Sequence, residues 1–402
     1  MTSNLSEAPA HMKRNVFLLS ACLALSMTGA SLVMVVVALT GKMLLPDGIW
    51  WTLPLTLQFV GTMCAVIPAN LLMRKYGRRI GFTLGQVIGI IAAFICYYAI
   101  MQDSFELFCV GGYFLGFHNA FWGYYRFAAA ETASHDFKSR AISFVMAGGV
   151  VAAIFGPELA KLTRELFAPI LFAGSYVAIA GLCVAAIILI QFIRIPGLSE
   201  EEKANTGRPL REIMKQPIFI VAVLSAMVGY GMMSLVMTAT PLAMQICGFE
   251  FDDSAFVIQW HALGMFAPSF FTGYLIRRFG VLRIILTGAV SNLLCVAINL
   301  SGVEFIQFFS SLVLLGIGWN FMFIGGTTLL TECYEPAERN KVQSLNDFLV
   351  FGTVSISSLS AGLLQRLIGW DAVNLAVIIP ILIVVFSVIW LTRMTRRTQP
   401  VG

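Results

Sequence analysis

Residues 61–77 read GTMCAVIPANLLMRKYG, an apolar run that ends in basic residues and a glycine. Residues 264–280 read GMFAPSFFTGYLIRRFG and are built in the same way. Four positions are identical at a separation of 203 residues: Gly61 and Gly264, Leu72 and Leu275, Arg74 and Arg277, Gly77 and Gly280. A second match, at a separation of 201, pairs Asn119 with Asn320 and Glu131 with Glu332. The chain is therefore predicted to consist of two similar halves.

The composition of the 402-residue chain indicates which solvent surrounds it. Hydrophobic residues make up 58% and charged residues 12%, whereas charged residues are about 25% of an ordinary soluble domain. So few charges cannot cover the surface of a soluble protein of this size, and a bilayer is the natural environment. This excludes soluble enzymes, disordered chains and nucleic-acid-binding domains. The eight cysteines are scattered singly, so neither a disulfide framework nor a structural zinc site is predicted.

Apolar runs of roughly 20 residues, enough to cross a bilayer, recur along the whole chain. They predict twelve transmembrane helices, over residues 16–40, 50–73, 80–101, 105–130, 141–162, 168–194, 217–245, 253–276, 281–300, 304–330, 342–368 and 372–394. The first run is too long for a cleavable signal. We therefore expect an all-α membrane protein with a six-helix half at residues 1–194, a polar linker at 195–216 and a second six-helix half at 217–402.

Lysine and arginine are unequally distributed between the two sides that these helices define. One side receives 21 of them, in both terminal segments and in the segments after helices 2, 4, 6, 8 and 10. The other side has four, Lys42, Lys161, Arg164 and Arg366, and Arg126 lies within a helix. Because cytoplasmic segments carry the excess of positive charge, both termini and the linker are predicted to be cytoplasmic. The net charge of +5 then reflects topology and not a basic binding surface.

The basic turns resemble a motif of the major facilitator superfamily. Residues 70–79, NLLMRKYGRR, are similar to that family's G-x-L-x-D-R-x-G-R-R signature, and residues 273–280, GYLIRRFG, are similar to its second copy. The resemblance implies a gating motif formed by Arg74, Gly77, Arg78, Arg277 and Gly280. Arg74 and Arg277 stand where the motif has an aspartate, so the family's charge relay lacks its carboxylate here. Membership implies alternating access, with two halves moving around a site near the bilayer midplane.

Two consecutive predicted helices carry the residues that point to a substrate. Helix 217–245 contains Met233 and Met237, and helix 253–276 contains His261 and Met265. The members of each pair are four residues apart and so share one helical face. Counted from the outer ends, Met237 and His261 lie about 12 Å deep, and Met233 and Met265 about 18 Å deep. If the two helices face each other, the four side chains form two rungs near the middle of the bilayer.

The chemistry of these four side chains favours a soft metal ion. Thioether and imidazole groups are neutral donors that suit Cu(I). Neutral ligands create no buried anion and hold the ion less tightly than thiolates, as release from a carrier requires. The alternative is that the methionines only fill the core, although an ionisable residue such as His261 at membrane depth is usually functional.

An MxxxM pattern followed by HxxxM on the next helix resembles the CcoA-type copper importers of the superfamily. The resemblance implies a bacterial cytoplasmic-membrane protein that imports copper for cbb3-type cytochrome c oxidase. Copper would be the substrate, with no permanently bound cofactor, and the implied partners are copper chaperones or oxidase assembly factors and the lipid bilayer. Some relatives in this clade are thought to carry riboflavin, so a riboflavin or other organic-solute permease is the alternative. A metal sensor or assembly factor would be favoured by a long soluble domain, which the sequence lacks.

Other residues are weaker candidates for a role in transport. Cys247, just past helix 217–245, is placed to pass copper inward. Arg126 suits proton coupling or an anion contact, or else an anchor paired with Glu131, and Asp347 is a titratable group in a predicted span. The aromatic-rich helix 105–130 offers stacking for a flat ring, although aromatic residues are common in membrane helices. No nucleotide-binding loop, GxSxG or HExxH pattern occurs, so no enzyme activity is predicted.

Overall fold

The computed structural model describes residues 7–132, 144–145, 147–195, 207–335 and 338–398. These residues are mostly helical, and an isolated β-bridge joins Phe167 and Ile170. The chain divides into two compact units, unit 1 at Met1–Glu200 and unit 2 at Glu201–Gly402. The division falls within the predicted linker. Residues 196–206 of that linker, and the predicted cytoplasmic residues Lys138 and Arg140, lie outside the described part of the chain.

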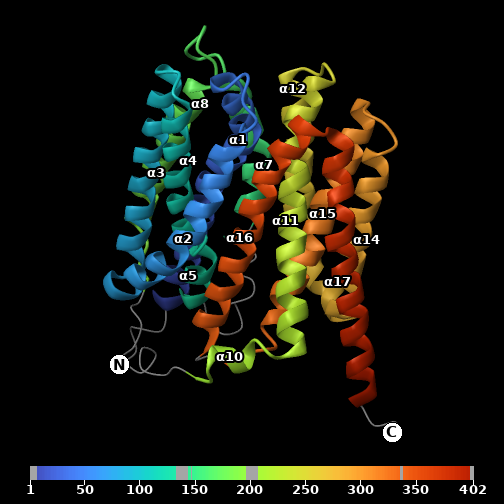
Figure 1. Ribbon diagram of the computed structural model, residues 1–402. Coiled ribbons are helices and arrows are strands. Elements are labelled where there is room, and N and C mark those ends of the chain that lie inside the picture. Colours follow the sequence, from blue (N-terminus) through green and yellow to red (C-terminus); the bar gives the residue numbers. More distant parts are fainter. Residues whose placement is uncertain (1–6, 133–143, 146, 196–206, 336–337, 399–402) are drawn as a thin grey trace. The chain divides into compact units, whose positions relative to one another are not determined.

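Unit 1 is a bundle whose helices pack through small residues. Its helices are α1 (Glu7–Leu44), α2 (Leu53–Tyr76), α3 (Arg78–Met101), α4 (Phe105–Trp122), α5 (Tyr125–Thr132), α7 (Gly148–Thr163) and α8 (Ala173–Ile190) (Figure 1). α4 packs against α2 and α3, α1 against α7, and α8 against α3 and α1. Gly61 of α2 lies directly against the Tyr113 carbonyl of α4, and Gly116 of α4 against the Gln58 carbonyl of α2. A side chain at either glycine would push the two helices apart, which is why small residues allow such close packing.

Unit 2 is built in the same way around α15. Its helices are α10 (Leu210–Ile213), α11 (Pro217–Ile246), α12 (Phe251–Phe266), α13 (Ser269–Phe279), α14 (Val281–Asn299), α15 (Phe305–Leu330), α16 (Arg339–Leu367) and α17 (Trp370–Thr398). α15 packs against α11, α12 and α14, and α11 also packs against α16 and α17. Gly264 of α12 meets α15 as Gly61 of α2 meets α4, because a Cβ at Gly264 would lie 2.8 Å from the Val313 carbonyl. The repeated glycine therefore has the same packing role in both units.

The repeated basic turns also share one backbone conformation. Gly77 separates α2 from α3, and Gly280 separates α13 from α14, each with a φ of 88°. A positive φ of this size is strained for residues that carry a Cβ, so glycine is the residue that this turn requires. The backbone conformation of this turn thus explains why both copies of the motif have a glycine here.

The predicted spans and the observed helices differ at several places. Among the described residues, nine helices are long and apolar enough to cross a membrane. The predicted span 105–130 is divided after Trp122 into α4 and α5, and the span 253–276 is divided at Ala267–Pro268 into α12 and α13. The span 168–194 is shorter as a helix, because α8 begins at Ala173 and ends at Ile190. In the span 141–162, residues 144–145 and 148–162 are helical, and residues 141–143 and 146 lie outside the described part of the chain. Hydropathy reports the length of an apolar run, whereas an interruption depends on single residues such as Pro268, which has no N–H to donate.

Candidate functional site

The interruption between α12 and α13 is held by one asparagine of α15. The Asn320 amide nitrogen donates to the Met265 carbonyl at 2.6 Å and to the Ser269 hydroxyl at 2.7 Å, while its oxygen accepts from the Thr272 hydroxyl at 2.7 Å. These bonds supply a partner to a carbonyl beside the break, as an apolar environment requires. Interrupted helices at membrane depth are a common place for transporters to bind substrate, and Met265 lies at this one.

His261 lies one turn before Met265 and is fully buried. Its Nδ1 is 2.8 Å from the Leu312 carbonyl of α15. A carbonyl only accepts, so Nδ1 carries the proton of the neutral ring and Nε2 keeps a lone pair. Nε2 is buried and has no hydrogen-bond partner among the described residues. Holding one ring nitrogen on a backbone carbonyl while the other stays free is how proteins orient a metal-binding histidine.

Glycines bring the backbone of α12 against α15 at this level. A Cβ on Gly316 would contact the His261 carbonyl directly and would lie 2.8 Å from the Met265 nitrogen. Gly316 therefore lies opposite the turn of α12 that joins His261 to Met265. The register between these two helices is fixed at the predicted site.

α11 approaches α15 from another side and brings its methionines to the same level. A Cβ on Gly326 of α15 would lie 2.8 Å from the Ala222 carbonyl, and one on Gly229 would lie 2.8 Å from the Met322 Cβ. α11 and α15 are antiparallel, so continuing this register places Met233 at about the level of Gly318 and Met237 at about the level of Leu314. His261 and Met265 contact α15 at Leu312 and at Gly316 and Asn320. Met237 therefore lies at about the level of His261 along α15, and Met233 at about the level of Met265.

The four residues are positioned by the packing of α11 and α12 on α15, and not by direct packing of α11 on α12. α11 and α12 share little contact with each other, and each packs closely against α15. Met233, Met237 and Met265 are 1%, 6% and 7% exposed, so all three are buried like His261. The prediction of two facing rungs becomes an arrangement in which two helices present their residues beside a common third helix. Among the described residues, no three His, Cys, Asp or Glu side chains are grouped to hold a metal ion, so a metal here depends on the thioethers.

The sequence analysis missed an aromatic cluster on the same side of α15. Trp319 stacks on Phe323, with ring centroids 5.0 Å apart and planes 14° apart. Tyr230 of α11 and Phe266 of α12 each meet Trp319 edge-on, at 5.6 and 5.8 Å. Trp319 is 5% exposed, and its Nε1 has no hydrogen-bond partner among the described residues. Trp319 is the repeat counterpart of His118, at the separation of 201 residues that relates Asn320 to Asn119, and this relation was the available signal.

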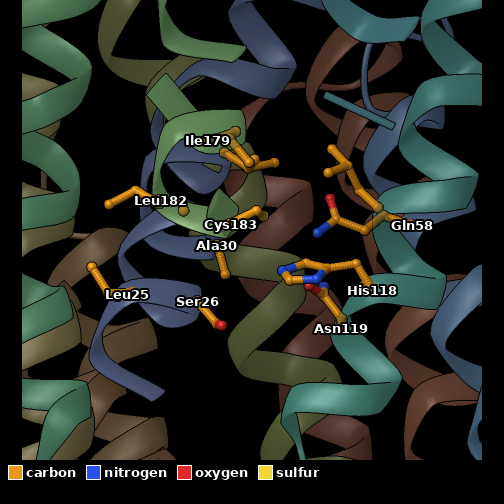
Figure 2. Close-up of a pocket in the computed structure, with 12 residues that line it drawn as sticks. Leu25, Ser26, Ala30, Gln58, His118, Asn119, Ile179, Leu182 and Cys183 are labelled. Carbon is orange, nitrogen blue, oxygen red and sulfur yellow. The ribbon is translucent and has the colours of Figure 1, made fainter. Parts of the chain in front are cut away.

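Unit 1 has a small pocket between α1, α2, α4 and α8, which the sequence analysis did not predict. Figure 2 shows the polar side chains that line it, among them Gln58, His118, Asn119 and Cys183. His118 Nδ1 is 3.0 Å from the Gly85 carbonyl, and Gln58 Oε1 is buried without a hydrogen-bond partner among the described residues. Gln58 is the repeat counterpart of His261, at a separation of 203.

The structure describes the side chains of three of the four weaker candidates. Cys247 caps the end of α11 and is exposed, about 15 Å along the helix from Met237. Arg126 lies in α5 of unit 1, and the side chain of Glu131 lies outside the described part of the chain. Asp347 of α16 accepts a hydrogen bond from the neighbouring Asn346 amide at 3.2 Å. Cys247 is thus separated from Met237 by almost three helical turns.

The gating motif is described in part. The Arg78 guanidinium lies over the Tyr124 ring, 5.5 Å from its centroid, and the Tyr124 hydroxyl donates to the Val66 carbonyl at 3.1 Å. Arg277 is exposed in the last turn of α13. The side chain of Arg74 lies outside the described part.

A buried carboxylate attaches the end of the linker to unit 2. Glu338, which precedes α16, accepts from the Arg208 backbone nitrogen, Nε and Nη2, each at 2.7 Å. The Glu338 side chain is fully buried, whereas that of Arg208 is 44% exposed. The hydrogen bonds from Arg208, joined by one from the Glu335 backbone, lower the pKa of Glu338 to about 2.

Comparisons with known proteins identify relatives over almost the whole chain. Riboflavin transporter RfnT of Brucella anthropi is 42% identical over 364 residues, which are 90% of this chain and 92% of that protein. Two uncharacterized MFS-type transporters of Bacillus subtilis, YdeG and YddS, are each 26% identical. Those matches cover 89% and 85% of this chain, and 86% and 82% of the relatives.

A match to a family model assigns the chain to a protein family. The Major Facilitator Superfamily model matches residues 16–300 and 230–401. The predictions of an all-α membrane fold, of a multi-pass transporter and of a protein without enzyme activity are confirmed by this match and by the helical structure. The finer resemblance to copper importers gains no support from the relatives. The chain belongs to the Major Facilitator Superfamily.

Proposed function

We propose that this transporter imports copper by alternating access, with Met233, Met237, His261 and Met265 as ligands. The observation that carries the proposal is the buried Nε2 of His261, for which the described part of the chain supplies no hydrogen-bond partner, while Nδ1 is held by the Leu312 carbonyl. A buried polar atom without a partner is costly in an apolar interior, and a bound cation would compensate for it. Three thioethers at the same two levels supply the other soft donors.

Riboflavin is the second candidate substrate. The relatives favour riboflavin, whereas the surroundings of His261 favour copper. The supporting observation is the 42% identity to a protein named as a riboflavin transporter. The aromatic cluster of Tyr230, Phe266, Trp319 and Phe323 is consistent with it, since a flavin ring stacks on aromatic side chains. The Trp319 Nε1 group would supply a hydrogen-bond donor to such a ring.

The two candidates are separated by measuring uptake of radioactive copper and of riboflavin in cells with and without this chain. Copper import predicts copper accumulation that His261→Asn abolishes, because asparagine can still donate to the Leu312 carbonyl but has no Nε2. Protein levels in the membrane serve as the control. Accumulation of riboflavin without copper would identify the second candidate as correct.

The physiological consequence gives a second measurement. If copper import supplies cbb3-type cytochrome c oxidase, deletion lowers oxidase activity and cellular copper, and added copper restores both. Restoration by riboflavin and not by copper would reject copper import.

A further inference from the structure

We propose that the pocket of unit 1 is a second soft-metal site, in which His118 Nε2 and Cys183 Sγ bind Cu(I). The proposal rests on copper being the substrate of this chain. It concerns residues of α4 and α8, none of which belongs to the group on α11, α12 and α15.

The first support is the hydrogen bonding of His118. Its Nδ1 lies 3.0 Å from the Gly85 carbonyl of α3, so Nδ1 must be the protonated nitrogen and Nε2 keeps its lone pair. His118 is 4% exposed and lines the pocket. His261 has the same arrangement in unit 2, with Nδ1 on the Leu312 carbonyl. Each unit therefore holds one buried histidine by a backbone carbonyl of a neighbouring helix, which is the orientation that metal-binding histidines have.

The second support is a thiol beside that ring. A Cβ on Gly89 of α3 would lie 2.8 Å from His118 Nδ1 and 2.9 Å from Cys183 Sγ, so ring and thiol lie against the same glycine. Figure 2 shows both side chains directed into the pocket. Imidazole and thiolate are donors that Cu(I) accepts.

The third support is Gln58, which is 2% exposed and lines the same pocket. Its Oε1 is buried without a hydrogen-bond partner among the described residues. A buried polar atom without a partner in a native structure is commonly explained by a bound water or ion. Gln58 is also the repeat counterpart of His261, so the position that carries a candidate ligand in one unit lines this pocket in the other.

Binding at this site changes no oxidation state. A Cu–S bond forms, the S–H bond of Cys183 breaks, and the proton passes to solvent. The thiolate and the Cu⁺ ion together are neutral, which makes their burial in an apolar bundle acceptable. Ligation by His261 and three thioethers releases no proton, so proton release distinguishes the two sites.

The test is a Cu(I) titration of the purified full chain in detergent, in competition with a coloured Cu(I) chelator and under reducing conditions. Wild type is expected to bind two ions per chain and to release one proton. His118→Asn keeps a donor for the Gly85 carbonyl but removes Nε2, and Cys183→Ser removes the sulfur. Each of these variants should bind one ion and release no proton. Cys183→Met keeps a soft donor and should bind two ions with no proton released.

Two controls make the outcome specific. Cys96→Ala alters another buried cysteine of unit 1, one that packs against Gly111 outside the pocket, and should bind two ions. His261→Asn should bind one ion and still release one proton. If His118→Asn and Cys183→Ser both bind as many ions as wild type, the second site is wrong, whether or not cells import copper. If wild type binds no Cu(I) and cells accumulate only riboflavin, both proposals are wrong.

Discussion

At the residue scale, the hydrogen bonding of the two ring nitrogens distinguishes a metal-binding histidine from one that only fills the core. A histidine that only fills space usually has both ring nitrogens satisfied, because a buried polar atom without a partner costs about 1–3 kcal/mol. In His261, Nδ1 is held by the Leu312 carbonyl, and Nε2 has no partner within the part of the chain that the structure describes. The same distinction applies to the methionines, for which volume and donor chemistry can be changed separately.

Methionine-to-leucine changes separate ligation from packing. Met233→Leu and Met265→Leu conserve side-chain volume and should cost less than about 1.5 kcal/mol of stability. Leucine has no donor atom, so copper uptake should fall by more than the roughly tenfold loss that outer-shell changes produce. The measurement is copper uptake normalised to the amount of protein in the membrane.

Met232 provides the matched control. It is 9% exposed and buried like Met233, but it points about 100° away on the helix. Met232→Leu should therefore leave uptake unchanged. Wild-type uptake by both Met233→Leu and Met265→Leu would mean that the methionines are packing residues.

Relations between residues that are close in sequence can be predicted from the sequence, whereas relations between residues on separate helices cannot. Helical periodicity alone predicts that Met233 and Met237 share a face, because the two lie one turn apart in one helix. It does not place Cys183 and His118 against the same glycine, or bring Asn320 to Met265, because these residues lie on separate helices whose register depends on packing. The tautomer of His261 depends on such a contact as well.

At the element scale, α15 determines where α12 lies, through glycines that admit no side chain. Repeated Gly61 and Gly264 indicate from sequence that close contacts recur, but not which helices meet. The break between α12 and α13 also escapes hydropathy, since residues 253–276 form one apolar run. Pro268 removes a backbone donor at the break, and Asn320, more than 50 residues later, donates to the Met265 carbonyl beside it.

Gly316→Ala should disturb this packing. The new Cβ would press on the His261 carbonyl and lie 2.8 Å from the Met265 nitrogen, both of them backbone atoms that cannot move aside independently. Overpacking of this kind typically costs about 1–3 kcal/mol, and the thermal unfolding temperature in detergent should fall accordingly. Gly273→Ala on α13 is the control, because a Cβ there meets nothing within 4 Å. Equal unfolding temperatures for both variants would contradict the contact between α12 and α15.

The attachment of the linker to α16 should depend on acid. The pKa of Glu338 is lowered from its ordinary 4.5 to about 2 by Arg208. A lowered pKa means that the contribution to stability is complete above about pH 4.5 and is lost as the pH falls towards 2. The difference in unfolding temperature between wild type and Glu338→Gln should therefore be largest near neutral pH and shrink through this range. A difference that stays constant from pH 6 to pH 3 would show that the ionised carboxylate is not what stabilises this contact.

At the scale of the whole molecule, the sequence alone predicts two similar halves and a glycine turn that is repeated in both. The repeat predicts two similar halves, and the chain divides into two compact units whose boundary lies within the predicted linker. Both units use glycine with a φ of 88° at the repeated turn. The substrate is not readable in this way, because family membership determines the architecture whereas a few side chains inside each unit determine the chemistry.

The orientation of the chain in the membrane is the last prediction, and it rests on charge alone. Of the 26 lysine and arginine residues, 21 fall on one side of the predicted spans and four on the other. Because positively charged segments remain in the cytoplasm, reporters fused after Arg208 and after Arg397 should both be cytoplasmic, whereas a reporter fused within the segment around Lys42 should be outside. Arg208 tests the linker and Arg397 tests the parity of the second half, since an odd number of spans after Arg208 would place the two reporters on opposite sides. A periplasmic signal from Arg397 alone would thus change the number of spans in the second half, and one from both fusions would invert the whole chain.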